Sequence, residues 1–159
     1  MPQLKAKDSV LLYFPAEKIY RVLTDFASYP EWYPKDIKFS IGYLDKKVIG
    51  TTLSIQNSPL VKWEAKITGF KPNELIGIDY INGAWLGKTK WELHEKGPQT
   101  LLTYEIDLQV NKGWLRFLGN IINFGKYHSK QMQSIFKNLE KYLAQEKSIK
   151  PNEKPDSRH

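Results

Sequence analysis

The side chains that could carry out acid–base chemistry in this chain are few and widely spaced. Its three histidines are His94, His128 and His159, and no two have the short spacing of a metal-binding pair. His128 lies four residues after Phe124 and four before Met132, so on a helix it would share their face. There it could act as a general base or contact a ligand, and the plainer alternative is a surface histidine or one satisfied in the core. The sequence predicts no metal site and no cofactor.

Other reactive groups lack the surroundings that catalysis requires. Glu105 and Asp107 share one face of an expected strand, opposite Tyr104, so we expect them in water. Cysteine is absent, which excludes disulfides and thiolate chemistry. No serine lies in a Gly-x-Ser-x-Gly elbow, and the glycine-containing segment 83–87 lacks the lysine and hydroxyl of a phosphate loop. We expect Asp25 to cap a short helix, and we assign no catalytic residue.

Large apolar and aromatic side chains are the more abundant candidates for a site. Aromatic residues make up 13% of the chain, enough for both a core and the flat walls of a pocket. The alternative is that they pack together and leave no void, as protein interiors usually do. Small residues at Gly119 and Gly125, within an expected helix, favour a pocket. The predicted ligand-binding residues are Trp63, Tyr80, Trp91, Tyr104, Ile121, Ile122, Gly125, His128 and Met132.

A second group of apolar residues is expected at the entrance to this pocket. They lie in expected connections or at a helix start, where bulky side chains are exposed unless they gate something. The predicted entrance residues are Trp85, Leu86, Trp114 and Phe117. Lys112, Arg116 and Lys126 are close in sequence, so this end could touch an anionic membrane transiently while a ligand enters or leaves.

The elements that must position these residues follow from hydrophobic periodicity. A strand is predicted over 9–14 and a short helix over 16–24, followed by a helical turn after Asp25. Period-two alternation then predicts six strands, at 37–43, 51–56, 61–68, 75–82, 88–94 and 102–110. The period returns to 3.6 after Gly113, which predicts one helix over 114–146. We predict a domain over 1–146 and a disordered polar tail over 147–159.

Strands in unbroken succession, followed by a helix, predict an α+β fold. We expect a curved seven-stranded antiparallel sheet around a long C-terminal helix, with two short helices after the first strand. The N-terminus has no apolar signal segment and no run is long enough to cross a bilayer, so we expect a cytoplasmic protein.

Three stretches carry a resemblance to a known family. They are 15–20, from Pro15 to Tyr20; the element Asp25-Phe26 followed by Tyr29-Pro30-x-Trp32; and the late strands around Trp91 and Tyr104. Together with the closing helix, the chain resembles the START-like (SRPBCC) helix-grip superfamily of polyketide cyclase/dehydrase and lipid transport proteins, most of all its coenzyme-Q-binding branch. The resemblance covers about residues 9–143. It implies a lipophilic cavity between sheet and helix, and it does not fix the ligand.

Three functions remain open from the sequence. The first is binding and transport of a hydrophobic small molecule such as a lipid, quinone or isoprenoid. The second is a polyketide aromatase/cyclase-type enzyme using His128, Tyr80 or Tyr104 as proton-transfer groups. The third is a ribosome- or RNA-associated module, which the net charge of +7 permits. Lysines alternate with acids along the strands, which argues against a nucleic acid partner. We therefore expect a binder of a hydrophobic molecule, and the sequence leaves open whether it also catalyses a reaction.

Overall fold

The computed structural model describes residues 3–119 and 123–147. The chain opens with a strand and three short helical segments, continues with six strands and closes with two helices. In chain order these are β1 (Gln3–Leu12), α1 (Ala16–Thr24), η1 (Phe26–Ser28), α2 (Tyr29–Trp32), β2 (Lys38–Tyr43), β3 (Thr52–Gln56), β4 (Lys62–Lys71), β5 (Leu75–Gly83), β6 (Trp85–Lys96), β7 (Gln99–Val110), α3 (Gly113–Gly119) and α4 (Phe124–Lys147). The predicted α+β class and seven-stranded sheet are confirmed.

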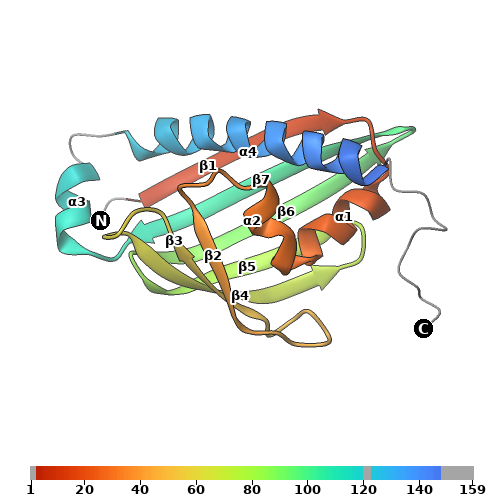
Figure 1. Ribbon diagram of the computed structural model, residues 1–159. Helices are drawn as coiled ribbons and strands as arrows, with labels where there is room; N and C mark the ends of the chain where they lie inside the picture. The colour runs from red at the N-terminus through yellow and green to blue at the C-terminus, as the bar shows by residue number, and fades with distance from the viewer. Residues whose placement is uncertain (1–2, 120–122, 148–159) are drawn as a thin grey trace.

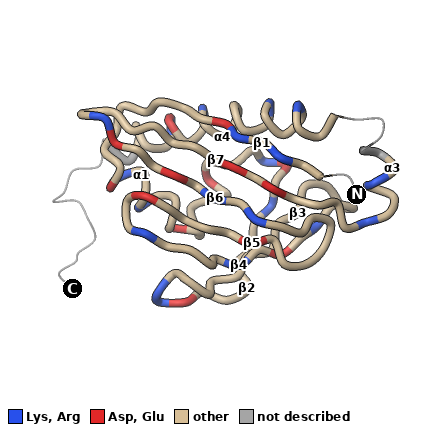
Figure 2. Tube along the Cα trace, turned by 180° about the vertical axis from the view of Figure 1, so that it is seen from behind, with Lys and Arg blue, Asp and Glu red and all other residues tan. Residues whose placement is uncertain are grey.

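The sheet is antiparallel throughout, with strand order β1-β7-β6-β5-β4-β3-β2. It curves beneath α4, which lies along its inner side, while α1 and α2 cover one end (Figure 1). Buried and exposed residues alternate along β3 and the second half of β7, as the period-two pattern predicts, whereas β2 is exposed along most of its length. On the outer face Lys90 lies 3.6 Å from Glu105, and Lys5 lies 3.9 Å from Asp107. Figure 2 shows acidic and basic segments alternating along these strands.

Two glycines allow strands to bend near one end of the sheet. Gly83 has φ 100° and Gly87 has φ 142°, a backbone region that side chains disfavour. A Cβ atom on Gly83 would collide with the backbone of β4, and one on Gly87 with the backbone of β7. The predicted connection at Trp85 and Leu86 is wrong, because both residues begin β6 and pair with β7.

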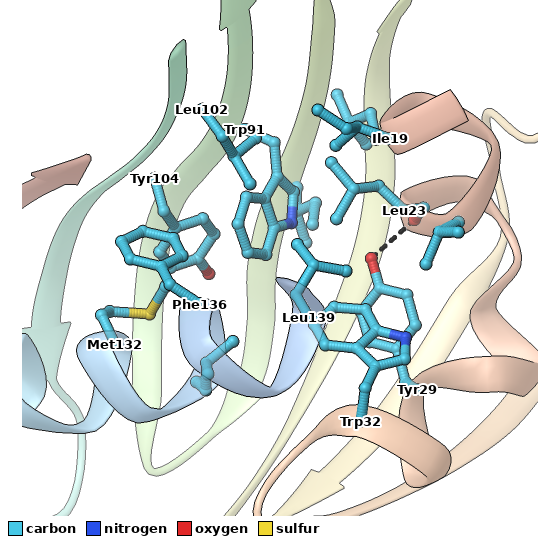
Figure 3. Packing of buried hydrophobic residues seen from close by; sticks show 14 of the residues in the cluster. Ile19, Leu23, Tyr29, Trp32, Trp91, Leu102, Tyr104, Met132, Phe136 and Leu139 are labelled. Atoms are coloured by element: carbon cyan, nitrogen blue, oxygen red, sulfur yellow. Dashed lines mark hydrogen bonds between the residues drawn. The ribbon is translucent and has the colours of Figure 1, made fainter. Parts of the chain in front are cut away.

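The aromatic element before β2 builds core. Tyr29 and Trp32 are almost fully buried. The Tyr29 hydroxyl donates to the Leu23 carbonyl at 2.6 Å, as the dashed line in Figure 3 shows. Asp25 takes the predicted N-cap position, before η1, but its side chain makes no capping hydrogen bond; the Ser28 hydroxyl instead donates to the Asp25 backbone carbonyl at 2.7 Å. The hydrogen bonds of this element are therefore local, and its rings fill the space under α4 (Figure 3).

The expected single helix over 114–146 is wrong in its first half. α3 ends at Gly119 and a separate helix, α4, begins at Phe124. The Asn123 side-chain oxygen accepts from the Lys126 backbone N–H at 3.0 Å, which caps α4 at its start. Apolar periodicity continues through this segment, so it concealed the break. Residues 120–122, which include Ile121 and Ile122, and residues 148–159 of the predicted tail lie outside the described residues.

Candidate functional site

A cavity of ≈ 260 Å³ lies between the inner face of the sheet and α4. Strands β1 to β7, α2, α3 and α4 or the turns next to them all contribute to its wall. The lining residues are Leu4, Tyr29, Tyr33, Ile37, Phe39, Leu53, Ile55, Asn57, Val61, Trp63, Ile78, Tyr80, Trp85, Trp91, Tyr104, Ile106, Leu108, Leu115, Phe124, Tyr127, His128, Gln131, Met132 and Ile135. Most are aliphatic or aromatic, which is the composition of a site for an apolar ligand.

Six of the nine predicted ligand-binding residues line this cavity: Trp63, Tyr80, Trp91, Tyr104, His128 and Met132. Gly125 is not part of the wall. A Cβ atom there would lie 3.8 Å from the Leu4 side chain, an ordinary van der Waals contact, so the glycine leaves no extra space for a ligand. The other two, Ile121 and Ile122, lie outside the described residues.

A pair of tyrosine hydroxyls is buried in the cavity wall. Tyr80 in β5 and Tyr104 in β7 reach over the intervening strand, and their oxygens lie 3.1 Å apart in a hydrogen bond. Trp91 packs on Tyr104 with ring centres 4.4 Å apart, and Trp63 packs on Tyr80 at 5.6 Å. Burial raises the pKa of both tyrosines above the ordinary value of 10.0, so both stay protonated. One of the two O–H groups donates to the other, which leaves one that this bond does not use.

A third polar group, His128 of α4, lies beside this pair. Its ring centre is 6.0 Å from that of Tyr104. Burial lowers the pKa of His128 and the nearby Asp8 carboxylate opposes that shift, so the imidazole is neutral at pH 7. The His128 Nε2 and Asp8 Oδ2 atoms are both buried with no hydrogen-bond partner among the residues that the structure describes. Unpaired buried polar atoms are costly, which makes this place a candidate for polar contacts with a ligand.

Asp8 had no role in the prediction, because the first strand was expected to start at Ser9. The strand actually starts at Gln3 and turns Leu4, Asp8 and Leu12 to the inner face. The signal was present, since an acid interrupts an otherwise apolar alternate row from Leu4 to Leu12. Trp63 Nε1 is a further buried polar atom. It lies near the Tyr80 oxygen and forms no hydrogen bond of standard geometry within the described part of the chain.

Aromatic side chains close the cavity toward α2. The sequence predicted a helical turn in this region but not its place in the cavity wall. Tyr29 and Tyr33 stack with ring centres 5.3 Å apart, and Phe39 of β2 meets both edge-on. Burial raises the pKa of Tyr29 and of Tyr33 well above 10.0, so both rings are neutral walls. The density of aromatic residues between Phe26 and Tyr33 could have indicated this wall.

At the end of the cavity away from α2, only one of the four predicted entrance residues lies in the wall. Trp85 lines the cavity, whereas Leu86, Trp114 and Phe117 do not. Leu115 occupies the wall instead, because α3 turns it inward and leaves its neighbours Trp114 and Phe117 in solvent. The remaining lining residues at this end were not predicted: Asn57, Val61, Phe124, Tyr127 and Gln131.

Residues 3–119 and 123–147 hold no group of three or more histidines and acids placed to bind a metal ion. In the same ranges, no helix is both long enough and apolar enough to cross a membrane.

Comparison with solved structures defines the class of fold. A START superfamily protein from Mycobacterium smegmatis superposes with a TM-score of 0.71 at 18% identity, over 89% of this chain and 97% of that one. Norcoclaurine synthase from Thalictrum flavum, in complex with dopamine and hydroxybenzaldehyde, gives 0.68 at 13% identity, over 93% and 90%. Ara h 8.0201 gives 0.65 at 14% identity, over 91% and 99%. The chain therefore has the START-like helix-grip fold.

The similarity to these structures lies in the fold, and the coenzyme-Q-binding branch stays a prediction. No protein-family model matches the chain, and no curated protein matches it by sequence. Its ligand chemistry therefore has to be argued from its own cavity.

Proposed function

We propose that this protein is a cytoplasmic binder and carrier of a hydrophobic small molecule, which it holds between the sheet and α4. The single observation that supports this most is the ≈ 260 Å³ cavity with its aromatic and aliphatic wall. The resemblance to the coenzyme-Q-binding branch favours a quinone- or isoprenoid-type ligand within this class. No nucleic acid partner is proposed, because lysines on the outer face pair with acids.

The volume limits which part of such a ligand the cavity encloses. An apolar cavity of roughly 150 Å³ holds one benzene ring. A volume of ≈ 260 Å³ therefore suits a head group of one or two rings, with any long tail extending through the mouth. The buried tyrosine pair and His128 would face the polar atoms of that head group.

Filling the cavity tests the proposal, with 2-naphthol as a two-ring probe and titration calorimetry as the measurement. Leu53→Trp enlarges a buried wall residue of β3, and we expect it to weaken binding at least tenfold. Ser54→Trp adds the same side chain to the exposed face of the same strand and should leave binding unchanged. Met132→Trp and Gln133→Trp form a second matched pair on α4.

Two results would overturn the proposal. One is that the wild-type protein takes up no two-ring probe. The other is that the Leu53→Trp and Met132→Trp proteins stay folded and bind the probe as the wild type does. Circular dichroism of each variant reports folding separately from binding. Mass spectrometry of the native protein purified from cells should find a co-purified apolar molecule.

An aromatase/cyclase-type enzyme is the second candidate, favoured by the placement of His128, Tyr80 and Tyr104 in one cavity. A neutral imidazole could remove a proton from a carbon beside a ketone while a tyrosine O–H bonds the ketone oxygen. His128 Nε2 is shielded in this conformation, so the ring must first rotate. Wild-type protein should then exchange the α-hydrogens of 2-tetralone in D₂O, seen by NMR, and His128→Gln should abolish exchange but not binding. Exchange at the buffer rate would refute catalysis.

A further inference from the structure

Large apolar side chains are exposed around the mouth of the cavity. On α3, Trp114 and Phe117 keep 44% and 66% of their surface in solvent, on either side of the inward Leu115. Leu60, in the turn before β4, is 75% exposed, and Tyr127 of α4 is 53% exposed although it also lines the cavity. We use the name apolar rim for these four residues: Leu60, Trp114, Phe117 and Tyr127.

The rim residues belong to segments that the fold brings together at one end. The Ala84 backbone N–H donates to the Lys62 carbonyl at 2.8 Å, and the Asn111 N–H donates to the Ala84 carbonyl at 2.8 Å. These bonds tie the turn before β4 to the start of α3, and Figure 1 shows α3 at the end of the sheet that lies away from α1. A small apolar cluster seals the junction: Ala84, Val110 and Leu115, with Val61, Trp85 and Phe124 against it.

The stretch of chain from the end of β7 through most of α4 carries basic residues and no acids. Between Asp107 and Glu140 the sequence contains no acidic residue and five basic ones: Lys112, Arg116, Lys126, Lys130 and Lys137. Lys62 adds a sixth cation at the start of β4. The arrangement differs from the outer sheet face, where lysines lie within ion-pair distance of carboxylates. Figure 2 shows basic segments and no acidic segment on α3.

We propose that the apolar rim and the cations beside it dock the protein on an anionic lipid bilayer. Aromatic side chains with one polar edge insert at the boundary between headgroups and acyl chains, and lysines and arginines bind the anionic headgroups. Contact at the rim turns the mouth of the cavity toward the lipid. A hydrophobic ligand then passes between bilayer and cavity without crossing water, so this role rests on the proposed ligand binding.

The geometry favours a bilayer over nucleic acid. Bases stack on aromatic side chains that stand on an open platform, such as a sheet face. Here the exposed rings lie on α3 and α4, next to the cavity-lining Leu115 and Tyr127, and the outer face of the sheet carries paired charges. The apolar rim and its neighbouring cations therefore fit a lipid bilayer, which has an apolar interior and anionic headgroups at its surface.

Vesicle flotation tests the proposal with the full chain. We expect binding to vesicles of phosphatidylcholine and phosphatidylglycerol at 4:1, at least tenfold tighter than to phosphatidylcholine alone, and weakened in 0.5 M NaCl. The double change Trp114→Ser and Phe117→Ser should lower partitioning at least fivefold. Lys112→Glu with Lys126→Glu should lower it more than tenfold, since each cation near the surface contributes about fivefold.

Matched controls use a distant turn of similar chemistry. Tyr43→Ser with Leu44→Ser removes two exposed apolar side chains, and Lys46→Glu with Lys47→Glu reverses two exposed charges; both should leave partitioning unchanged. Failure of the wild type to float, equal loss in rim and control variants, or salt-sensitive binding to single-stranded RNA without flotation would overturn the proposal. Titration with 2-naphthol keeps the two proposals apart. Flotation without probe binding refutes the cavity function, and probe binding without flotation refutes docking.

Discussion

At the scale of single residues, the cavity combines an apolar wall with three polar groups whose protons are fixed by burial. Tyr80 and Tyr104 stay protonated and share one hydrogen bond of 3.1 Å. His128 stays neutral and faces Asp8 from the other side. A ligand that enters therefore meets hydrogen-bond donors and a neutral imidazole in a low-dielectric place, where such bonds are stronger than in water.

The tyrosine pair should show energetic coupling in a double-mutant cycle. Tyr80→Phe and Tyr104→Phe should each lower the free energy of unfolding by about 1 kcal/mol, because each leaves the other hydroxyl without this bond. The double variant should lose less than the sum, with a coupling of roughly 1 kcal/mol. Urea denaturation measures all four proteins, and Tyr43→Phe on the exposed end of β2 serves as the control. Strictly additive losses would show that the pair contributes no mutual bond.

His128 should make stability depend on pH in a defined window. Burial holds its pKa below the ordinary 6.5, so in acid the unfolded chain binds a proton that the folded chain resists. The contribution is complete above about pH 6.5 and declines as the pH falls below that value. His128→Gln should flatten the decline in unfolding free energy between pH 7.5 and pH 5.5, and the exposed His94→Gln should not. A wild-type curve unaffected by His128→Gln would contradict the assignment.

At the scale of elements, short connections decide the shape of the cavity. The break between α3 and α4 lets Leu115 turn inward from one helix while Tyr127 and His128 approach from the next. One continuous helix would carry all of these residues on a single straight axis.

Removing the cap of α4 should therefore be measurable. Asn123→Ala deletes the side-chain oxygen that accepts from the Lys126 N–H, which should cost about 1 kcal/mol and lower the melting temperature by about 3 °C. Asn138→Ala makes the same change inside α4, where alanine suits a helix better, and should not destabilise the protein. Calorimetry compares the two. A fall in melting temperature for both variants alike would argue against a capping role.

At the scale of the whole molecule, charge and apolar surface are distributed unevenly. The outer sheet face carries mixed, paired charges, whereas the α3 end carries cations and exposed rings. A solvated face needs neither aromatic side chains nor an excess of one sign. The two faces therefore meet different surroundings, water on one side and the proposed lipid surface at the mouth.

The proposed domain also predicts where the chain can be shortened. The described buried core ends at Leu143, and the residues beyond 147 are polar and contain two prolines. A chain ending at residue 147 should keep its melting temperature within about 1 °C and bind 2-naphthol as the full chain does. Deletion to residue 138 instead removes Leu139 and Leu143 and should prevent cooperative unfolding. Equal effects of both deletions would place the domain boundary elsewhere.

The sequence by itself determined the elements and the sheet, because both depend on local periodicity. Alternation indicates a strand and its buried face independently of the neighbouring elements. An example is the row of Leu102, Tyr104 and Ile106, which alternates with Thr103 and Glu105. The same logic placed Trp63, Tyr80 and Trp91 on the inner face that lines the cavity. Element boundaries were predicted less well. At β1 the charged Asp8 interrupts the apolar row of inward-facing residues, so the first residues of the strand were missed.

Only the tertiary structure decided whether the apolar interior leaves a space, and which side chains reach it. A void depends on how closely the sheet and α4 approach, and that distance is set by contacts between residues far apart in sequence, such as Trp85 against Phe124. On α3, Leu115 is buried while Trp114 and Phe117 stay in solvent, although all three are apolar neighbours. Periodicity cannot distinguish these outcomes, because it reports which residues avoid water and not what they pack against.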